Sequence, residues 1–313
     1  MRIGRRVIAL TLFGCLILTL ATGILLCEGT LHPVRRPLTG DDESRAHDFA
    51  QAHHATLQEV SVQTPDQITL RAWLLTPENP NADAVIVLHG LSDNRVGMTG
   101  YAELLLDHGY TVLMPDARAH GASGGPIATY GLVERNDIHQ WTSWLSKYRH
   151  PNCIDALGES MGAAQLLQAL TAEPQFCAVV AESSFSNFRE IGYDRVGQFF
   201  HTGPWLGRTF FRPAIELAFV YARWKYHLDL SQVSPEAAVV GTRVPVLLIH
   251  GKEDSNISVR HGERIAARNR QVVLWEVPST DHCGAISTSG KEFAARVINW
   301  YESHEKTLET VKP

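Results

Sequence analysis

The fold of this chain is decided by the stretch IDALGESMGAAQ at positions 154–165. Apart from Asp155, its first residues are apolar, as in a buried strand, and its last residues favour a helix. Between them stands Gly-x-Ser-x-Gly, with the serine at position 160. Small residues on both sides of a serine suit a sharp, strained turn from strand to helix, which exposes the hydroxyl in front of the helix N-terminus. We therefore predict that Ser160 is a nucleophile rather than part of an ordinary turn.

Runs of β-type residues alternate with helical segments on both sides of this stretch. The later runs are almost entirely apolar, which is typical of strands buried on both faces of a parallel sheet. Two opening strands followed by strand–helix alternation predict an α/β fold, a mostly parallel sheet with helices on both faces. We expect strands at 57–62, 68–75, 84–89, 110–115, 153–158, 177–182, 244–250 and 272–277, and helices at about 99–108, 132–148, 161–171, 258–269 and 289–304.

One segment interrupts the alternation. About sixty residues, rich in aromatic side chains, separate the sixth expected strand from the seventh. A structureless loop of that length is improbable in a compact domain, so we predict a helical insertion at about 185–240. Its aromatic side chains either pack on the edge of the sheet or form a lid over the site that contains Ser160.

A serine hydroxyl needs a base, usually an imidazole that a carboxylate holds in one tautomer. With this type of turn, the acid and then the histidine follow the serine along the chain. Asp254 comes in the loop after the seventh strand and His282 in the loop after the eighth, so both emerge at the same edge of the sheet as Ser160. Asp281 is the rival acid, but a residue next to the base usually points away from it. We therefore predict a triad of Ser160, Asp254 and His282.

The negative oxygen formed by attack on an acyl group needs preorganised donors. We expect the backbone amide of Met161 to be one and that of Leu91, after the third strand, to be the other. His89 is interpreted as a structural residue that holds the loop of Leu91. Three polar residues after the fourth strand are interpreted as fixing their loop, with substrate contact as the alternative. They are Asp116, Arg118 and His120.

An apolar run from Val7 to Cys27 carries no charge and, at about 1.5 Å per residue, can cross a hydrocarbon core of about 30 Å as a helix. Residues 1–27 are therefore a membrane anchor or an export signal. The arginines before the run favour a cytoplasmic N-terminus and an extracytoplasmic body. An uncleaved anchor is favoured over a cleaved signal, because apolar residues continue after the Ala-x-Gly candidate at 21–23.

The remaining boundaries follow from these elements. Residues 28–56 are expected to form a linker and a short helix, residues 57–305 the main domain with its insertion, and residues 306–313 a tail. Hydrophobic residues make up 44% of the chain, enough for a folded core. The net charge is −5, and without the three N-terminal arginines it is about −8. That sign opposes binding to nucleic acid.

Taken together, the Gly-x-Ser-x-Gly motif at 158–162, Asp254 and His282 make the chain resemble α/β-hydrolase-fold serine hydrolases. It is similar to bacterial esterases and to serine-aminopeptidase-like members. The resemblance implies an eight-stranded sheet, a helical cap after the sixth strand, an acyl-serine mechanism and no cofactor or metal. The chain lacks the His-Gly-Gly-Gly run of the lipase branch, which leaves the geometry of the second oxyanion donor open.

The expected function is hydrolysis of carboxylic esters, with a small or medium acyl substrate and with the membrane as the partner of the N-terminal helix. The same triad would serve a thioesterase, an acyltransferase or an aminopeptidase. An aminopeptidase also needs an anion for the substrate ammonium, and three acidic residues are candidates: Glu159, Glu182 and Asp194. A non-catalytic binding module is the alternative from another class.

The resemblance also makes the fifth and sixth strands parallel neighbours, which brings Cys153 and Cys177 to the edge of the sheet opposite the site. Parallel strands lie about 4.8 Å apart, close to the Cα separation of a disulfide. The two cysteines therefore form either a disulfide, which an oxidising compartment would preserve, or a pair of buried free thiols.

Overall fold

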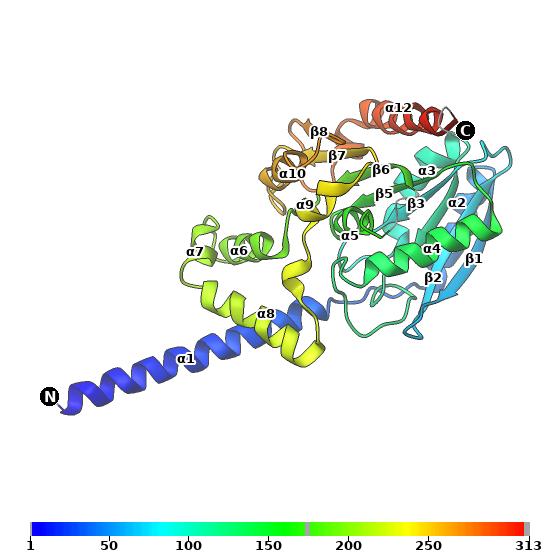
Figure 1. The fold of residues 1–313 in the computed structure, drawn as a ribbon. Helices are drawn as coiled ribbons and strands as arrows, with labels where there is room; N and C mark the ends of the chain where they lie inside the picture. The colour runs from blue at the N-terminus through cyan, green and yellow to red at the C-terminus, as the bar shows by residue number, and fades with distance from the viewer. Residues whose placement is uncertain (1, 173–175, 310–313) are drawn as a thin grey trace. The chain divides into compact units, whose positions relative to one another are not determined.

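The computed structural model describes residues 2–172 and 176–309. The chain divides into two compact units. The larger unit comprises Pro33–Ser186 and Ser234–Pro313, and the smaller unit comprises Met1–His32 and Asn187–Val233. Figure 1 shows that the larger unit is a twisted sheet with helices packed around it.

The larger unit contains an eight-stranded sheet in the order β1-β2-β4-β3-β5-β6-β7-β8. The β1 and β2 strands pair antiparallel, as do β2 and β4, and the other pairs are parallel. This arrangement confirms the predicted mostly parallel α/β fold. The strands are β1 (Ala55–Gln63), β2 (Thr69–Pro77), β3 (Ala84–Leu88), β4 (Thr111–Pro115), β5 (Ile154–Glu159), β6 (Phe176–Glu182), β7 (Val246–Gly251) and β8 (Val272–Val277).

Helices cover both faces of this sheet, so the central strands are buried on both sides. In β3, Ile86 belongs to one core cluster while Val85 and Val87 belong to the other. That alternation explains why the strand sequence is continuously apolar. The helices of the unit are α2 (Gly40–Ala52), α3 (Thr99–Asp107), α4 (Glu134–Tyr148), α5 (Met161–Ala169), α9 (Pro235–Ala238), α10 (Arg260–Ala266), α11 (Ala285–Thr288) and α12 (Gly290–Glu309).

The smaller unit joins the N-terminal helix to the insertion after β6. It contains α1 (Arg2–Leu31), α6 (Phe188–Phe199), α7 (Trp205–Arg208) and α8 (Arg212–Tyr226). Tyr193, Val196 and Ile215 form its core, against which Leu26 of α1 packs. Part of the insertion's apolar surface is therefore covered by α1, a partner that the sequence analysis did not consider.

Several boundaries differ from those expected. The α1 helix continues past Cys27 because Leu31 is buried and Glu28 binds the side chains of Lys225 and Tyr226. The insertion contributes Asn187–Val233 to the smaller unit, less than the expected 185–240. The last helix, α12, runs through the start of the expected tail at 306–313, whose residues 310–313 lie outside the described residues.

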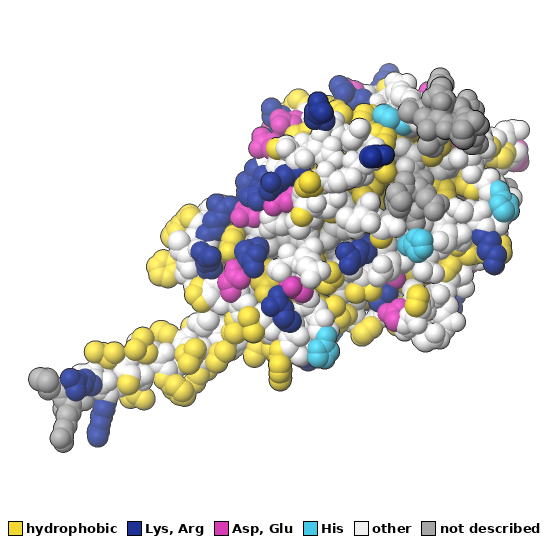
Figure 2. Space-filling view, in the orientation of Figure 1, with side chains coloured by type: hydrophobic (Ala, Val, Ile, Leu, Met, Phe, Trp, Pro, Cys, Tyr) yellow, Lys and Arg dark blue, Asp and Glu magenta, His cyan; other side chains and the backbone are white. Residues whose placement is uncertain are grey.

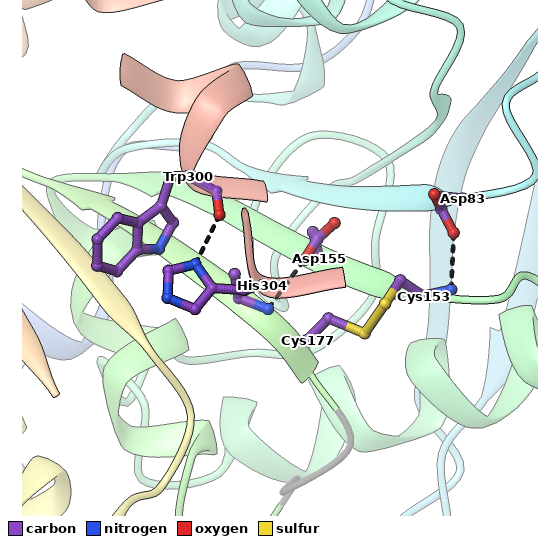
Figure 3. Close-up of a disulfide and its surroundings, with 7 residues drawn as sticks. Asp83, Cys153, Asp155, Cys177, Trp300 and His304 are labelled. Carbon is purple, nitrogen blue, oxygen red and sulfur yellow. Dashed lines mark hydrogen bonds between the residues drawn. A yellow bond between two sulfur atoms is a disulfide. The ribbon is translucent and has the colours of Figure 1, made fainter. Parts of the chain in front are cut away.

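A disulfide joins Cys153 to Cys177 at the amino ends of β5 and β6, with 5.8 Å between their Cα atoms (Figure 3). The two cysteines are not direct partners, because the register pairs Ile154 with Phe176 and then shifts at a β-bulge. Directly paired residues on parallel strands hold their side chains side by side, which rarely brings two sulfur atoms into bonding position. The irregularity means that these two cysteines are not held in that way. Of the two alternatives expected from the sequence, a disulfide or two free thiols, the structure contains the disulfide.

Replacing both cysteines with serine should lower the free energy of unfolding by about 3 kcal/mol, because the bond closes a loop of 24 residues in the unfolded chain. Denaturant unfolding of the full chain in mild detergent measures this difference. A reductant should destabilise the wild type and leave the double variant unchanged. Alkylation of the denatured, unreduced chain should label Cys15, Cys27 and Cys283 only. Labelling of Cys153 and Cys177 as well would contradict the bond.

Candidate active site

The turn that carries Ser160 is strained and tightly packed. Ser160 has φ 50° and ψ −111°, a backbone conformation that residues other than glycine rarely adopt. A Cβ on Gly158 would lie 2.7 Å from the carbonyl carbon of Gly162, and a Cβ on Gly162 would lie 2.4 Å from the carbonyl oxygen of Leu88. Both positions therefore require glycine. The amide of Ser160 donates to the carbonyl of Glu182 at 2.8 Å, which ties the turn to the end of β6.

Three side chains predicted from the sequence lie in one hydrogen-bonded chain. Ser160 Oγ lies 3.0 Å from His282 Nε2. His282 Nδ1 lies 2.9 Å from Asp254 Oδ2. Because a carboxylate only accepts, Nδ1 carries the proton and Nε2 of the neutral imidazole accepts from the serine. This is the geometry that a serine nucleophile and its base require.

Asp254 is buried and its position is fixed by backbone donors. Its Oδ1 accepts from the amides of Asn256 at 2.9 Å and Ile257 at 2.7 Å. Burial alone would raise the pKa of this carboxyl, but the hydrogen bonds from His282 and the backbone hold the pKa below its ordinary value. Asp254 therefore stays ionised beside the imidazole.

The rival acid, Asp281, does not orient the imidazole. Its Oδ1 accepts from the Ser255 amide at 2.8 Å, from the Ser255 hydroxyl at 3.0 Å and from the His282 amide at 2.8 Å. The carboxylate thus joins the loop after β8 to the loop after β7. It fixes the distance between the segments that carry His282 and Asp254.

His250 is a further residue of this site, which the sequence analysis did not single out. It is fully buried at the end of β7, and its Nε2 donates to the carbonyl of Ile257 at 2.7 Å. The same nitrogen lies 3.5 Å from Asp254 Oδ2. Burial lowers the pKa of His250, so its ring is neutral and holds the loop of Asp254 in place. Its only sequence signal was a histidine at a strand end, four residues before the acid.

The two expected amide donors lie on segments next to Ser160. Met161 is the first residue of α5, where backbone amides have no partner within the helix. A Cβ on Gly90 would lie 3.6 Å from Ser160 Cβ, so the loop that leads into Leu91 passes beside the serine. His89 donates from Nδ1 to the Gly90 carbonyl at 2.7 Å and accepts from the Ala117 amide at 3.0 Å. Its burial, with His120 nearby, lowers the pKa of His89 to about 4, in keeping with the structural role interpreted from the sequence.

The polar residues after β4 bind protein groups, as the loop-fixing interpretation expects. Asp116 accepts from the backbone amide of Arg95 at 2.8 Å and pairs with its guanidinium at 2.7 Å. Arg118 forms two hydrogen bonds of 2.6 Å to Asp137. His120 donates from Nδ1 to the carbonyl of Arg118 at 2.9 Å.

Two of the acidic residues considered for substrate binding bind Tyr101 instead. The Tyr101 hydroxyl lies 2.9 Å from Glu182 Oε2 and 3.1 Å from Glu159 Oε2. The other oxygen of Glu182 accepts from the Ala285 amide at 2.9 Å. The third candidate, Asp194, lies in α6 of the smaller unit. The sequence analysis missed Tyr101, because a tyrosine on a helix carries no local signal of such a contact.

Comparison with known proteins places this chain in a family. Residues 85–296 match the model of the alpha/beta hydrolase family. The uncharacterised protein YqkD of Bacillus subtilis is 32% identical over 196 residues, which cover 62% of this chain and 61% of that protein. The match therefore spans less than two thirds of this relative. The uncharacterised protein YfhR of Escherichia coli K12 is 23% identical, with 74% and 75% of the two chains covered.

Solved structures agree with the fold. An esterase from Pyrococcus furiosus superposes with a TM-score of 0.69 at 25% identity, covering 88% of this chain and all of that one. An acylaminoacyl peptidase from Pyrococcus horikoshii superposes with a TM-score of 0.61 at 17% identity, covering 83% and 43% of the two chains, and shares the fold. The family model spans well over half of the sequence, from β3 to α12, and the chain belongs to the alpha/beta hydrolase family.

Proposed function

We propose that this hydrolase cleaves carboxylic esters through an acyl-serine intermediate, with Ser160 as nucleophile, His282 as base and Asp254 as the residue that orients the base. The observation that carries the proposal is the continuous chain from Ser160 Oγ through the His282 ring to Asp254. The similarity to an esterase at 25% identity supports the ester as substrate.

The proposed reaction has two halves. His282 Nε2 accepts the hydroxyl proton as Ser160 Oγ attacks the acyl carbon, and the amides of Met161 and Leu91 stabilise the oxyanion. The imidazolium then donates that proton to the departing alcohol oxygen. Water, deprotonated by the same imidazole, attacks the acyl-serine and releases the acid. The ionised Asp254 stabilises the imidazolium in both halves.

The environments of Glu182 and Glu159 argue for an ester over a peptide with a free amino terminus. Glu182 is buried, and its two oxygens bind Tyr101 and the Ala285 amide. Burial raises the pKa of Glu182 from 4.5 to about 7 and also raises the pKa of Glu159. A carboxyl that is buried and partly protonated near neutral pH is a poor anchor for a substrate ammonium.

The full chain should hydrolyse p-nitrophenyl esters and leave aminoacyl-nitroanilides intact. Ser160→Ala, His282→Ala and Asp254→Asn should each lower kcat/KM by at least about 10³-fold, and the combined loss should fall far short of the product because the three residues act as a unit. Steady-state kinetics measure these losses.

Asp281→Asn is the matched control for the acid, because this carboxylate contacts Ser255 rather than the imidazole ring. Asp281→Asn should lower kcat/KM by less than about tenfold. In serine proteases, an Asp→Asn change at the carboxylate that orients the base lowers kcat by about 10⁴-fold. A larger loss from Asp281→Asn than from Asp254→Asn would contradict the assignment. Cleavage of the anilides in preference to the esters would favour the peptidase alternative.

Glu182→Gln should change how stability depends on pH. A carboxyl with a raised pKa in the folded state contributes stability that is complete below about pH 4.5 and is lost as the pH rises to about 7. The wild type should therefore lose on the order of 3 kcal/mol relative to Glu182→Gln across that window. Unfolding at pH 4.5 and pH 8 measures the difference. The exposed Glu263→Gln serves as control, and parallel curves for wild type and Glu182→Gln would contradict the raised pKa.

We further propose that α1 is an uncleaved membrane anchor and that the catalytic unit lies outside the cytoplasm. Gly23, Cys27 and Leu31 are buried, whereas the large apolar side chains from Val7 to Leu20 are exposed. A cut at the Ala-x-Gly candidate would fall inside a continuous helix where it contacts α8. The Cys153–Cys177 disulfide supports an oxidising compartment.

The full chain should therefore remain in the membrane pellet after alkaline carbonate extraction. Its mass should include residues 1–27, and protease added outside intact cells or spheroplasts should digest the catalytic unit. If carbonate releases the chain with residues 1–27 still attached, both the anchor and the export signal are contradicted. A mature N-terminus near residue 24 would instead favour the cleaved signal.

A further inference from the structure

Four large aromatic side chains are exposed together at one corner of the smaller unit. Phe199 is 79% exposed, Phe210 77%, Trp205 56% and Phe200 45%. We call these four residues the aromatic corner. Figure 2 shows hydrophobic side chains gathered at α7 and along α1. Exposed apolar side chains that gather on one part of a surface often mark a binding site.

The aromatic corner is a folded feature, because α6, α7 and α8 pack together there. The rings of Phe199 and Phe200 lie 5.0 Å apart, and Phe200 lies 5.2 Å from Phe211. The Phe211 amide donates to the carbonyl of Leu206 at 3.2 Å, which holds the start of α8 against α7. The four rings are thus presented by a fixed backbone.

The contacts between α1 and α8 give the orientation of this corner relative to the anchor. A Cβ on Gly23 would lie 2.8 Å from the Ala214 carbonyl oxygen, near the start of α8. Five residues later, Glu28 contacts Lys225 Nζ and Tyr226 Oη, each at 2.7 Å, at the end of α8. The two helices therefore run parallel. The start of α8, with Phe210 just before it, lies level with the part of α1 that precedes Gly23.

The exposed part of α1 fixes where a membrane would end. The uncharged residues 7–22 span about 24 Å at 1.5 Å per residue, most of the thickness of a hydrocarbon core, and Arg5 and Arg6 precede them. Burial against α8 begins at Gly23. The membrane boundary thus falls near the start of α8, beside Phe210 of the aromatic corner.

We propose that the aromatic corner inserts into the headgroup and upper acyl region of the bilayer that α1 crosses. The inference rests on the membrane anchoring proposed above. Trp favours this interfacial layer, and Phe side chains enter the boundary between headgroups and acyl chains on the apolar faces of interfacial helices. The smaller unit would then hold the membrane at two places, through the anchor and through the corner.

The chain contains a matched pair of tryptophans for testing this. Trp205 belongs to the aromatic corner, whereas Trp224 is 75% exposed and lies twelve residues beyond Arg212 on α8. That separation is about 18 Å along the helix, away from the predicted membrane boundary. Trp224 should therefore remain in water while Trp205 contacts lipid.

The experiment uses the full chain reconstituted in phosphatidylcholine vesicles whose lipids are brominated either near the headgroup end or near the tip of the acyl chains. Bromine near the headgroup end should quench wild-type tryptophan fluorescence more strongly than bromine at the tip. Trp205→Phe should abolish most of this quenching, and Trp224→Phe should preserve it. Phe199→Ser with Phe210→Ser should reduce the quenching of Trp205, and both positions are exposed enough to leave the fold intact.

The outcomes separate this inference from the proposals on which it rests. If the protein remains with the vesicles after carbonate treatment but Trp205→Phe does not change the quenching, the insertion of the aromatic corner is contradicted. The membrane anchor is then still supported. Unquenched Trp205 emission has the same consequence, whether water or a protein partner covers the ring. Protein that leaves the vesicles on carbonate treatment overturns both. Ester hydrolysis, measured on the same samples, tests the catalytic proposal independently.

Discussion

The close packing of backbone around Ser160 is the constraint on which the geometry of the candidate site depends. Gly162 lies so near the Leu88 carbonyl, and Gly158 so near Gly162, that any side chain at either position would displace β3, β5 or α5. The strain at Ser160 persists because the sheet and helix around it over-determine its conformation. That packing presents the hydroxyl at the carboxyl edge of the sheet, where the loops after β3, β7 and β8 meet it.

Buried polar contacts then make those loops rigid. His250 holds the Asp254 loop, Asp281 joins that loop to the segment of His282, and His89 holds the backbone that leads to Leu91. Polar groups in a low-dielectric interior are costly unless they are paired, so each contact favours one arrangement of its loop. The distances of 3.0 Å from Ser160 to His282 and 2.9 Å from His282 to Asp254 are thus maintained by these neighbouring residues.

The smaller unit shows how an apolar N-terminal helix becomes part of a folded body. Leu26 packs with Ile215 and Tyr193, and the ion pair of Glu28 with Lys225 fixes the end of the same helix. The insertion after β6 consequently shares its core with the N-terminus, although nearly two hundred residues separate them in the chain. Exposed aromatic side chains then remain near the start of α8, beside the apolar stretch of α1.

The sequence by itself determined the eight strands, the turn at Ser160 and the chain order of acid and histidine, because periodicity and glycine spacing act over a few residues. Tertiary structure decided what depends on long-range register. The tertiary structure decided that Asp254, rather than Asp281, contacts the imidazole ring of His282. It also set the β-bulge that lets Cys153 bond to Cys177, and it packed α1 against α8. The Tyr101 contact with Glu182 joins residues 81 positions apart. Local sequence carries no record of such contacts, because strand pairing and helix packing alone bring their partners together.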